Sequence, residues 1–128
     1  GPELFEKAKK LHQEHAGNVF ISGGEPTVTL KGDGKGGRNQ ELVLSMVPLL
    51  AGSDSVFASF GTDGVDGMSP AAGAIADGFT MKRAIDEKMK VDDYLKRNDS
   101  YSFFHRLKDD LITGPTGTNV MDVQILMF

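Results

Sequence analysis

Cysteine is absent from this 128-residue chain. Without it the chain cannot form a disulfide, bind a metal through thiolates or use a cysteine nucleophile. A run of Lys or Arg is missing as well, and the formal net charge is -4. We therefore expect no nucleic-acid partner and no binding to an anionic membrane surface. A local basic site for a small anion remains compatible with this charge.

Long apolar segments are also lacking. No apolar run approaches the length that a membrane span requires, and the opening segment is charged and helical in character rather than that of a signal peptide. We expect no membrane partner. A chain without cysteine fits a reducing compartment, and the predicted location is the cytoplasm.

Glycine, in contrast, is abundant. The chain has 16 glycines, roughly twice the number that an average content of about 7% would give. Hydrophobic residues make up 39% and charged residues 25%, which is typical of a globular chain. Most of the glycines fall between predicted elements, so the positions that need glycine are informative about function.

The hydrophobic pattern predicts alternating strands and helices. Helices are expected over 3–15, 38–50, 71–88 with an interruption near Gly78, 91–97 and 99–107, and strands over 19–21, 27–30, 56–60, 111–112 and 122–128. This order indicates a single α/β domain over 1–128, into which the first helix (3–16) leads. We expect a mixed sheet flanked by helices, with glycine-rich loops at strand ends, where open α/β sheets bind ligands.

The first glycine loop, 32–37, matches G-x-G-x-x-G, but no acidic residue follows at the spacing of a dinucleotide site. As a P-loop it is a near miss, with Arg38 in place of Lys and Asn39 where a hydroxyl residue would bind magnesium, so we do not expect a P-loop. Arg38 lies at the start of a predicted helix, where free N–H groups favour an anion. Two interpretations stay open: an anion site that uses Arg38, or a hairpin tip in which Arg38 pairs with Glu41.

Two further loops carry polar groups. Asp63 and Asp66 lie between glycines after a predicted strand, and they favour either a Mg²⁺ site or turns that bond their own backbone. The third loop offers hydroxyl and amide groups at Thr116, Thr118 and Asn119, which could bind ligand oxygens or only shape a turn.

Five segments together resemble one family. They are SGGEPTVT at 22–29, GGRNQE at 36–41, GTDGVDG at 61–67, NDSY at 98–101 and TGPTGTN at 113–119. In this order they are similar to the MOFRL domain, the C-terminal part of class II glycerate 2-kinases, which were formerly also labelled hydroxypyruvate reductases. The resemblance covers nearly all of the chain from Ser22 onward.

The resemblance implies transfer of the ATP γ-phosphoryl group to the 2-hydroxyl of D-glycerate, giving 2-phosphoglycerate, with Mg²⁺ as cofactor. It implies that Arg38 is the catalytic residue, which holds the glycerate carboxylate or stabilises charge on the transferred phosphoryl group. It makes Asp63 and Asp66 candidates for Mg²⁺ ligands or for contacts to the substrate hydroxyl. The implied substrate- and phosphate-binding residues are Gly36, Gly37, Asn39, Gln40, Glu41, Thr116, Thr118 and Asn119.

The family also implies a partner. Its active site lies between this domain and a larger N-terminal kinase domain, so we expect the chain to be inactive unless such a domain is supplied in cis or in trans. Two alternatives remain: a free-standing module that binds a small anion or nucleotide without catalysis, and an NAD(P)-linked hydroxypyruvate reductase.

Overall fold

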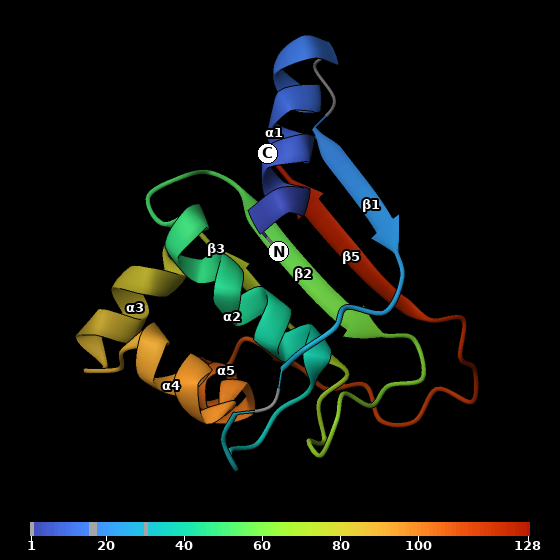
Figure 1. Ribbon diagram of the computed structural model, residues 1–128, viewed down its shortest axis with the longest axis vertical. Helices are drawn as coiled ribbons and strands as arrows, with labels where there is room; N and C mark the ends of the chain where they lie inside the picture. The colour runs from blue at the N-terminus through green and yellow to red at the C-terminus, as the bar shows by residue number, and fades with distance from the viewer. Residues whose placement is uncertain (1, 16–17, 30) are drawn as a thin grey trace.

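A computed structural model describes residues 2–15, 18–29 and 31–128. One sheet runs through the molecule in the order β1-β5-β2-β3-β4 (Figure 1). Its strands are β1 (Val19–Gly23), β2 (Val56–Gly61), β3 (Gly73–Asp77), β4 (Asp110–Leu111) and β5 (Asp122–Met127). Every described pairing is antiparallel, so the sheet that we expected to be mixed is an antiparallel one. The closing strand β5 lies between β1 and β2 and pairs antiparallel with both.

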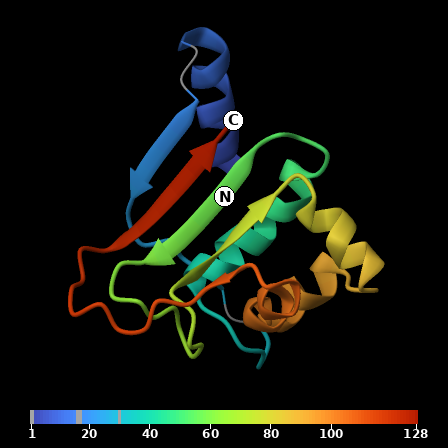
Figure 2. The ribbon, with the colours of Figure 1, turned by 180° about the vertical axis from the view of Figure 1, so that it is seen from behind.

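The helices gather on one face of this sheet, as two opposite views show (Figures 1 and 2). They are α1 (Pro2–His15), α2 (Arg38–Leu50), α3 (Thr80–Asp86), α4 (Val91–Arg97) and α5 (Ser100–Leu107). α2 packs on β2 and β3, and α3, α4 and α5 contact α2 in turn. The predicted α/β single domain is confirmed, with its helices on one side of the sheet only.

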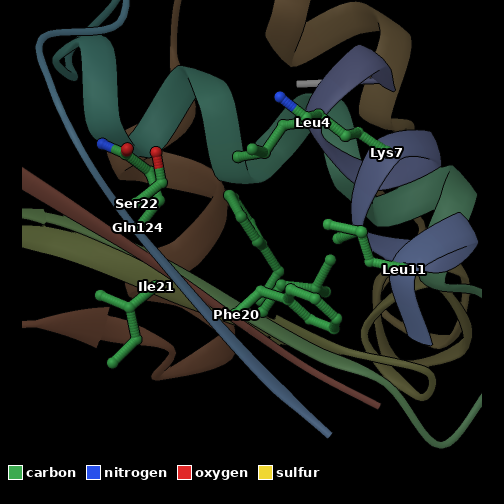
Figure 3. A pocket seen from close by; sticks show the side chains of 10 residues that line it. Leu4, Lys7, Leu11, Phe20, Ile21, Ser22 and Gln124 are labelled. Carbon is green, nitrogen blue, oxygen red and sulfur yellow. The ribbon is translucent and has the colours of Figure 1, made fainter. Parts of the chain in front are cut away.

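The core lies between α2 and the sheet. Leu44 and Leu50 of α2 meet Phe57 of β2 there, and all three are fully buried. Burial of each such side chain contributes about 1.5–3 kcal/mol. α1 adds Phe5 to the same core, and a small apolar cavity of about 170 Å³ remains between α1 and the sheet (Figure 3).

Two predicted elements differ from the structure. Residues 27–29 of the expected strand 27–30 form no strand, and its last residue lies outside the described part of the chain. Asn98 holds this segment instead, by donating from its side-chain amide to the Thr29 carbonyl oxygen. The prediction of one helix over 71–88 is wrong, because its first half is β3 and its second half is α3. Glycine and small alanine side chains let β3 lie close to α2.

Among the described helices, none is both long and apolar enough to cross a bilayer.

Candidate functional site

The site is built around the first turn of α2. A helix start leaves backbone N–H groups without partners, and the residue before this helix, Gly37, has no side chain to supply one. Asp66 from the second glycine loop fills that role. Its Oδ1 accepts from the Asn39 backbone N–H at 3.0 Å and its Oδ2 from the Gln40 backbone N–H at 2.9 Å. The anion bound at this helix terminus is therefore a carboxylate of the chain itself.

The side chains behind this cap point inward. Asn39 and Gln40 are 1% and 0% exposed, and their amide groups donate to the Asp66 carboxylate at 3.3 and 2.9 Å. Asn39 also accepts from the Ser59 hydroxyl, and Gln40 donates to the Ser69 hydroxyl. The structure places these two predicted ligand-binding residues in a buried polar layer that joins α2 to β2 and the second loop.

The two loops approach too closely for side chains. A Cβ on Gly67 would lie 2.3 Å from the Gly36 carbonyl oxygen, and a Cβ on Gly37 would lie 2.3 Å from the Asp66 carboxylate. Gly67 also has a φ of 62°, in the left-handed region that favours glycine. Glycine is thus required where the loops pack, and this contact positions the loop around Arg38.

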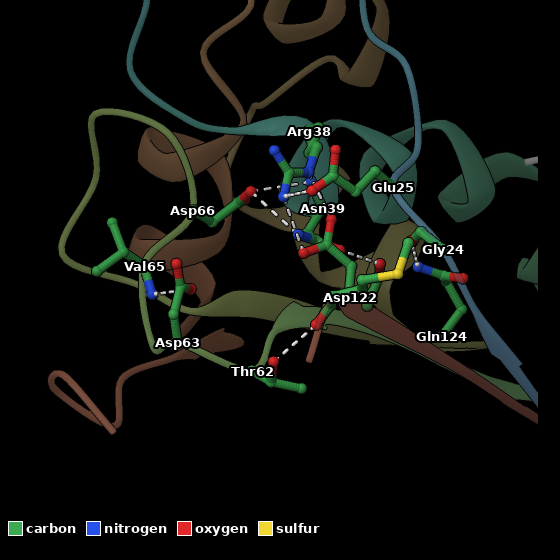
Figure 4. Close-up of polar contacts among 12 residues, drawn as sticks. Gly24, Glu25, Arg38, Asn39, Thr62, Asp63, Val65, Asp66, Asp122 and Gln124 are labelled. Carbon is green, nitrogen blue, oxygen red and sulfur yellow. Dashed lines mark hydrogen bonds and ion pairs between the residues drawn. The ribbon is translucent and has the colours of Figure 1, made fainter. Parts of the chain in front are cut away.

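Arg38 is held by two acidic side chains (Figure 4). Its Nε donates to Asp122 Oδ2 at 2.5 Å and its Nη2 to Asp122 Oδ1 at 3.0 Å, a two-pronged contact typical of Arg with carboxylate. Nη2 also reaches Glu25 Oε1 at 3.5 Å. The hydrogen bonds to Asp122 raise the pKa of Arg38 above its usual value, so the guanidinium is charged at any working pH. The pairing of Arg38 with Glu41, one of the two sequence interpretations, is not the pairing that the structure shows.

The remaining edge of the guanidinium is available for a ligand. No described residue bonds to Arg38 Nη1, and the side chain is 42% exposed, whereas that of Asp122 is 3% exposed. The buried Asp122 carboxylate thus fixes the orientation of the Arg38 guanidinium from its buried side.

Arg38 borders a cavity of about 400 Å³, which we call the glycine-loop cavity. Apolar and glycine residues form most of its wall, and polar groups come from α2 and the end of α4. Its lining residues are Pro26, Val28, Gly32, Gly34, Gly36, Gly37, Arg38, Glu41, Gly67, Met68 and Asn98. Such a concave, largely apolar site with a few polar groups is typical of small-molecule binding.

Asn98 and Glu41 form the polar part of this wall. Asn98 ends α4 in a left-handed conformation, and its Oδ1 accepts from the backbone N–H of Lys31 at 2.6 Å and of Gly32 at 2.9 Å. Its Nδ2 donates to Glu41 Oε2 at 3.4 Å. Asn98 therefore fastens the first glycine loop to α4 and α2.

Glu41 is 7% exposed, and burial raises the pKa of its carboxyl, while the neighbouring Ser100 and Asn98 oppose this shift. Glu41 Oε1 and Ser100 Oγ lie near one another, yet neither makes a well-directed hydrogen bond with any described residue. Glu41 is thus a buried acid with one oxygen unsatisfied, beside the cavity.

The expected magnesium ligands do not fit a direct metal site. Both oxygens of Asp66 already accept hydrogen bonds, and Asp66 is 2% exposed. Asp63 Oδ1 accepts from the Val65 backbone N–H at 3.1 Å, as in the turn interpretation. Within the described ranges there is no cluster of three or more His, Cys, Asp or Glu side chains that could hold a metal ion.

The third loop packs on the second loop and away from the cavity lining. Thr116 donates from its hydroxyl to the Thr62 carbonyl oxygen and from its backbone N–H to the Asp63 carbonyl oxygen. The Thr118 backbone N–H donates back to the Thr116 hydroxyl, and Asn119 accepts from Met121 N–H. The structure therefore brings Gly36, Gly37, Arg38 and Glu41 together at the cavity, and it places Thr116, Thr118 and Asn119 elsewhere.

Asp122 is a residue of this site that the sequence does not predict. The sequence pattern indicates it only as the first residue of the closing strand. A signal was available, because Asp122 and Gln124 alternate with apolar residues and share their face with the buried Leu126. A buried carboxylate needs a partner, but the identity of that partner, 84 positions away, could not be read from the strand.

Comparisons with known proteins identify the family of this chain. The model of the MOFRL family matches residues 18–122. The chain is 47% identical over 115 residues to a glycerate kinase of Danio rerio, covering 84% of this chain and 23% of the relative. It is 51% identical over 108 residues to a D-glycerate 2-kinase of Thermotoga maritima, covering 84% of this chain and 26% of the relative. The crystal structure of a glycerate kinase from Thermotoga maritima superposes with a TM-score of 0.83 at 48% identity, covering 86% of this chain and 27% of that one. The chain thus spans about a quarter of the length of the relatives it matches.

Proposed function

The chain belongs to the MOFRL family, and we propose that it is the substrate-binding domain of an ATP-dependent D-glycerate 2-kinase that works in the cytoplasm. The observation that carries this proposal is the setting of Arg38. A charged guanidinium is fixed by a buried carboxylate, and it presents an unbonded edge beside a cavity large enough for a small hydroxy acid. The relatives named glycerate kinase supply the substrate class.

The proposed chemistry is phosphoryl transfer. The 2-hydroxyl oxygen of glycerate forms a bond to the γ-phosphorus of ATP, the bond from that phosphorus to the β–γ bridging oxygen breaks, and the hydroxyl proton passes to a base. Negative charge grows on the transferred group and the leaving oxygen, and positioned cations stabilise it. Arg38 Nη1 is the group that this chain offers for that purpose or for the glycerate carboxylate.

The nucleotide and its Mg²⁺ belong, in this proposal, to the partner domain. Mg²⁺ neutralises phosphate charge during such a transfer, and the aspartates of the second loop are engaged in holding the loop and helix. The chain's own contribution is to bind glycerate, to orient it through Arg38 and to shield it by the glycine loop. We accordingly expect no turnover by the chain alone.

The experiment is a chimera. The matched quarter of the Thermotoga maritima D-glycerate 2-kinase is replaced by this chain, and the product formed from D-glycerate and ATP is identified by phosphorus NMR. We expect 2-phosphoglycerate. Arg38→Ala should lower kcat/KM by about 100-fold or more, the loss that follows removal of one charge-stabilising group. A fully folded chimera that forms no 2-phosphoglycerate would refute the proposal.

Arg83 provides a matched control. It also makes a two-pronged contact with a carboxylate, that of Asp109, and its side chain is 38% exposed against 42% for Arg38. It lies away from the glycine-loop cavity. Arg83→Ala should therefore leave kcat/KM within about 3-fold of the parent, a change of less than about 0.7 kcal/mol. Equal losses for both substitutions would remove the specific role of Arg38.

A free-standing binding module is the second candidate, favoured by the fact that residues of this chain line a cavity of about 400 Å³ beside Arg38. Calorimetry of the chain with D-glycerate, phosphate and Mg-ATP, each alone, separates the two. Saturable micromolar binding, together with an inactive chimera, would favour the module over the kinase domain.

A further inference from the structure

The sheet has a second face, and its composition is unusual. The strands β1, β5, β2 and β3 are in register, so their outward side chains form three rows across four strands. These rows are Val19, Met127, Val56 and Asp77; Ile21, Ile125, Ala58 and Ile75; and Gly23, Val123, Phe60 and Gly73. Of these twelve positions only Asp77, at one corner, carries a charge. We call this surface the open face.

No described helix covers the open face. In Figure 2, which views the sheet from this side, no helix in the described part of the chain crosses in front of these four strands. Ile21 is 72% exposed and Met127 is 44% exposed. Figure 3 shows that Ile21 lies on the opposite side of β1 from the α1 side chains Leu4 and Leu11. Antiparallel sheets with one face in water usually alternate apolar and polar side chains, and this sheet presents apolar side chains on both faces.

The largest apolar patch on a protein surface is often functional. The size of the open face indicates what kind of partner covers it. Four strands about 4.8 Å apart and about five residues long at 3.3 Å each give roughly 300 Å². A stable contact between separate proteins buries about 800 Å² on each partner. This flat footprint is less than half of that area, which favours a covalently linked segment over a second copy of the chain, because a linked segment has a high effective concentration and needs less area.

The relatives supply such a segment, since this chain matches only about a quarter of their length. We propose that the open face docks an apolar helical layer from the part of the family's polypeptide that lies outside the matched quarter. A helix layer is the usual cover for the free face of a sheet in α/β proteins. The N-terminal domain would then contact this chain at the open face as well as at the glycine-loop cavity. This inference rests on the two-domain kinase of the proposed function.

Accessibility of a single introduced thiol tests the docking directly. The chain has no cysteine, so Ile21→Cys creates one reporter on the open face, and its alkylation is followed by mass spectrometry of the peptide that contains it. We expect rapid labelling in the free chain. In the chimera with the Thermotoga maritima enzyme the rate should fall at least about 10-fold, because a covered thiol reacts only when the contact opens.

The matched control is Ile85→Cys. Ile85 is another exposed isoleucine, at 62%, and it lies on α3, on the helix side of the molecule. Its labelling rate should be the same in the free chain and in the chimera. A rate at Ile21→Cys that is equally unchanged would overturn the docking proposal. Slow labelling already in the free chain, with a dimer in sedimentation, would also overturn it by assigning the face to a second copy.

This test is independent of turnover. Protection at Ile21→Cys in a chimera that forms no 2-phosphoglycerate would support docking and refute the kinase function. An active chimera in which the thiol is not protected would support the kinase function and refute docking. Ile21→Lys gives a second measurement. It should lower the melting temperature of the chimera by several degrees more than Ile85→Lys does. In the free chain the two substitutions should change the melting temperature by similar amounts.

Discussion

Asp66 connects two segments through a single carboxylate. Its two oxygens receive four hydrogen bonds from Asn39 and Gln40, two from backbone and two from side-chain nitrogens. A carboxylate that accepts from the free N–H groups of a helix N-terminus stabilises the helix both by hydrogen bonding and by its favourable interaction with the helix dipole. Because the carboxylate is buried, its removal leaves buried donors without acceptors, which is more costly than the loss of the bonds themselves.

We therefore expect Asp66→Asn to lower the free energy of unfolding by about 3 kcal/mol. The substitution replaces one carboxylate oxygen by an NH₂ group, which is a donor and would face the N–H donors of Asn39 and Gln40. Urea unfolding followed by circular dichroism measures the loss. Asp63→Asn is the control, since Asp63 makes one exposed contact, and it should cost less than about 1 kcal/mol. Similar losses for the two substitutions would contradict the capping role.

Glu41 predicts a dependence of stability on pH. Burial raises the pKa of its carboxyl above the ordinary value of 4.5. Just above that pH the unfolded chain has lost the proton while the folded chain keeps it, so this group's contribution to stability falls as pH rises through the folded pKa. Glu41→Gln cannot titrate. Its stability relative to the parent should increase from pH 4 upward and then level off.

Urea unfolding at a series of pH values from 4 to 8 checks this expectation. Glu6→Gln removes a negative charge at an exposed position of α1 and serves as the control. A difference between Glu41→Gln and the parent that stays constant with pH would show that the carboxyl is not perturbed by folding.

At the scale of elements, the glycine loops act as packing surfaces. The second loop contacts the first through Gly67 and the third through Gly64, where a Cβ would meet the Gly114 carbonyl oxygen. The strand-end loops thus form one stack, and the cavity lies at the end of this stack beside α2. Their glycines serve backbone-to-backbone contact rather than direct approach to a ligand at each position.

Gly67→Ala and Gly114→Ala form a matched pair for this idea. Both glycines have positive φ, 62° and 69°, so alanine is strained at either position by about 1–2 kcal/mol. Only Gly67 has a backbone oxygen in the path of the new methyl group, whereas nothing lies within 4 Å at Gly114. Gly67→Ala should cost at least about 1 kcal/mol more than Gly114→Ala in urea unfolding. Equal costs would show that the loops do not pack as described.

Over the whole molecule, α1 belongs to the same core as the family domain although it precedes the matched residues 18–122. Phe5 is 6% exposed, and its ring lies 5.9 Å from that of Phe128, which also meets Phe20 of β1. The first helix, the edge strand and the end of the chain are therefore joined by one aromatic cluster.

We expect Phe5→Ala to destabilise the whole domain by about 3 kcal/mol, the usual cost of deleting a buried aromatic side chain. Unfolding should remain a single transition, because α1 shares its core with α2 and β5. Leu11→Ala, at 38% exposure, is the control and should cost less than about 1.5 kcal/mol. A separate early transition for α1 in hydrogen exchange would show that it is an independent unit.

The sequence by itself determined the elements whose pattern is local. The helix over 38–50 and the strand after Ser55 follow from the spacing of apolar side chains, and the family follows from motifs that are each contiguous. The prediction of a helix over 71–88 is wrong because it used local pattern alone. The pairing of β3 with β2 outweighs the helical preference of the alanines in this segment.

Only the tertiary structure decided which polar groups meet. Arg38 donates a hydrogen bond to Asp122, which lies 84 positions away in the sequence. The hydrogen bond from Gly32 to Asn98 spans 66 positions, and that from Gln40 to Asp66 spans 26. The position of β5 between β1 and β2 brings Asp122 under Arg38, and no periodicity within either segment encodes that position. Hydrogen bonds and charge pairs act over a few ångströms, so their partners are set by how distant segments pack rather than by sequence spacing.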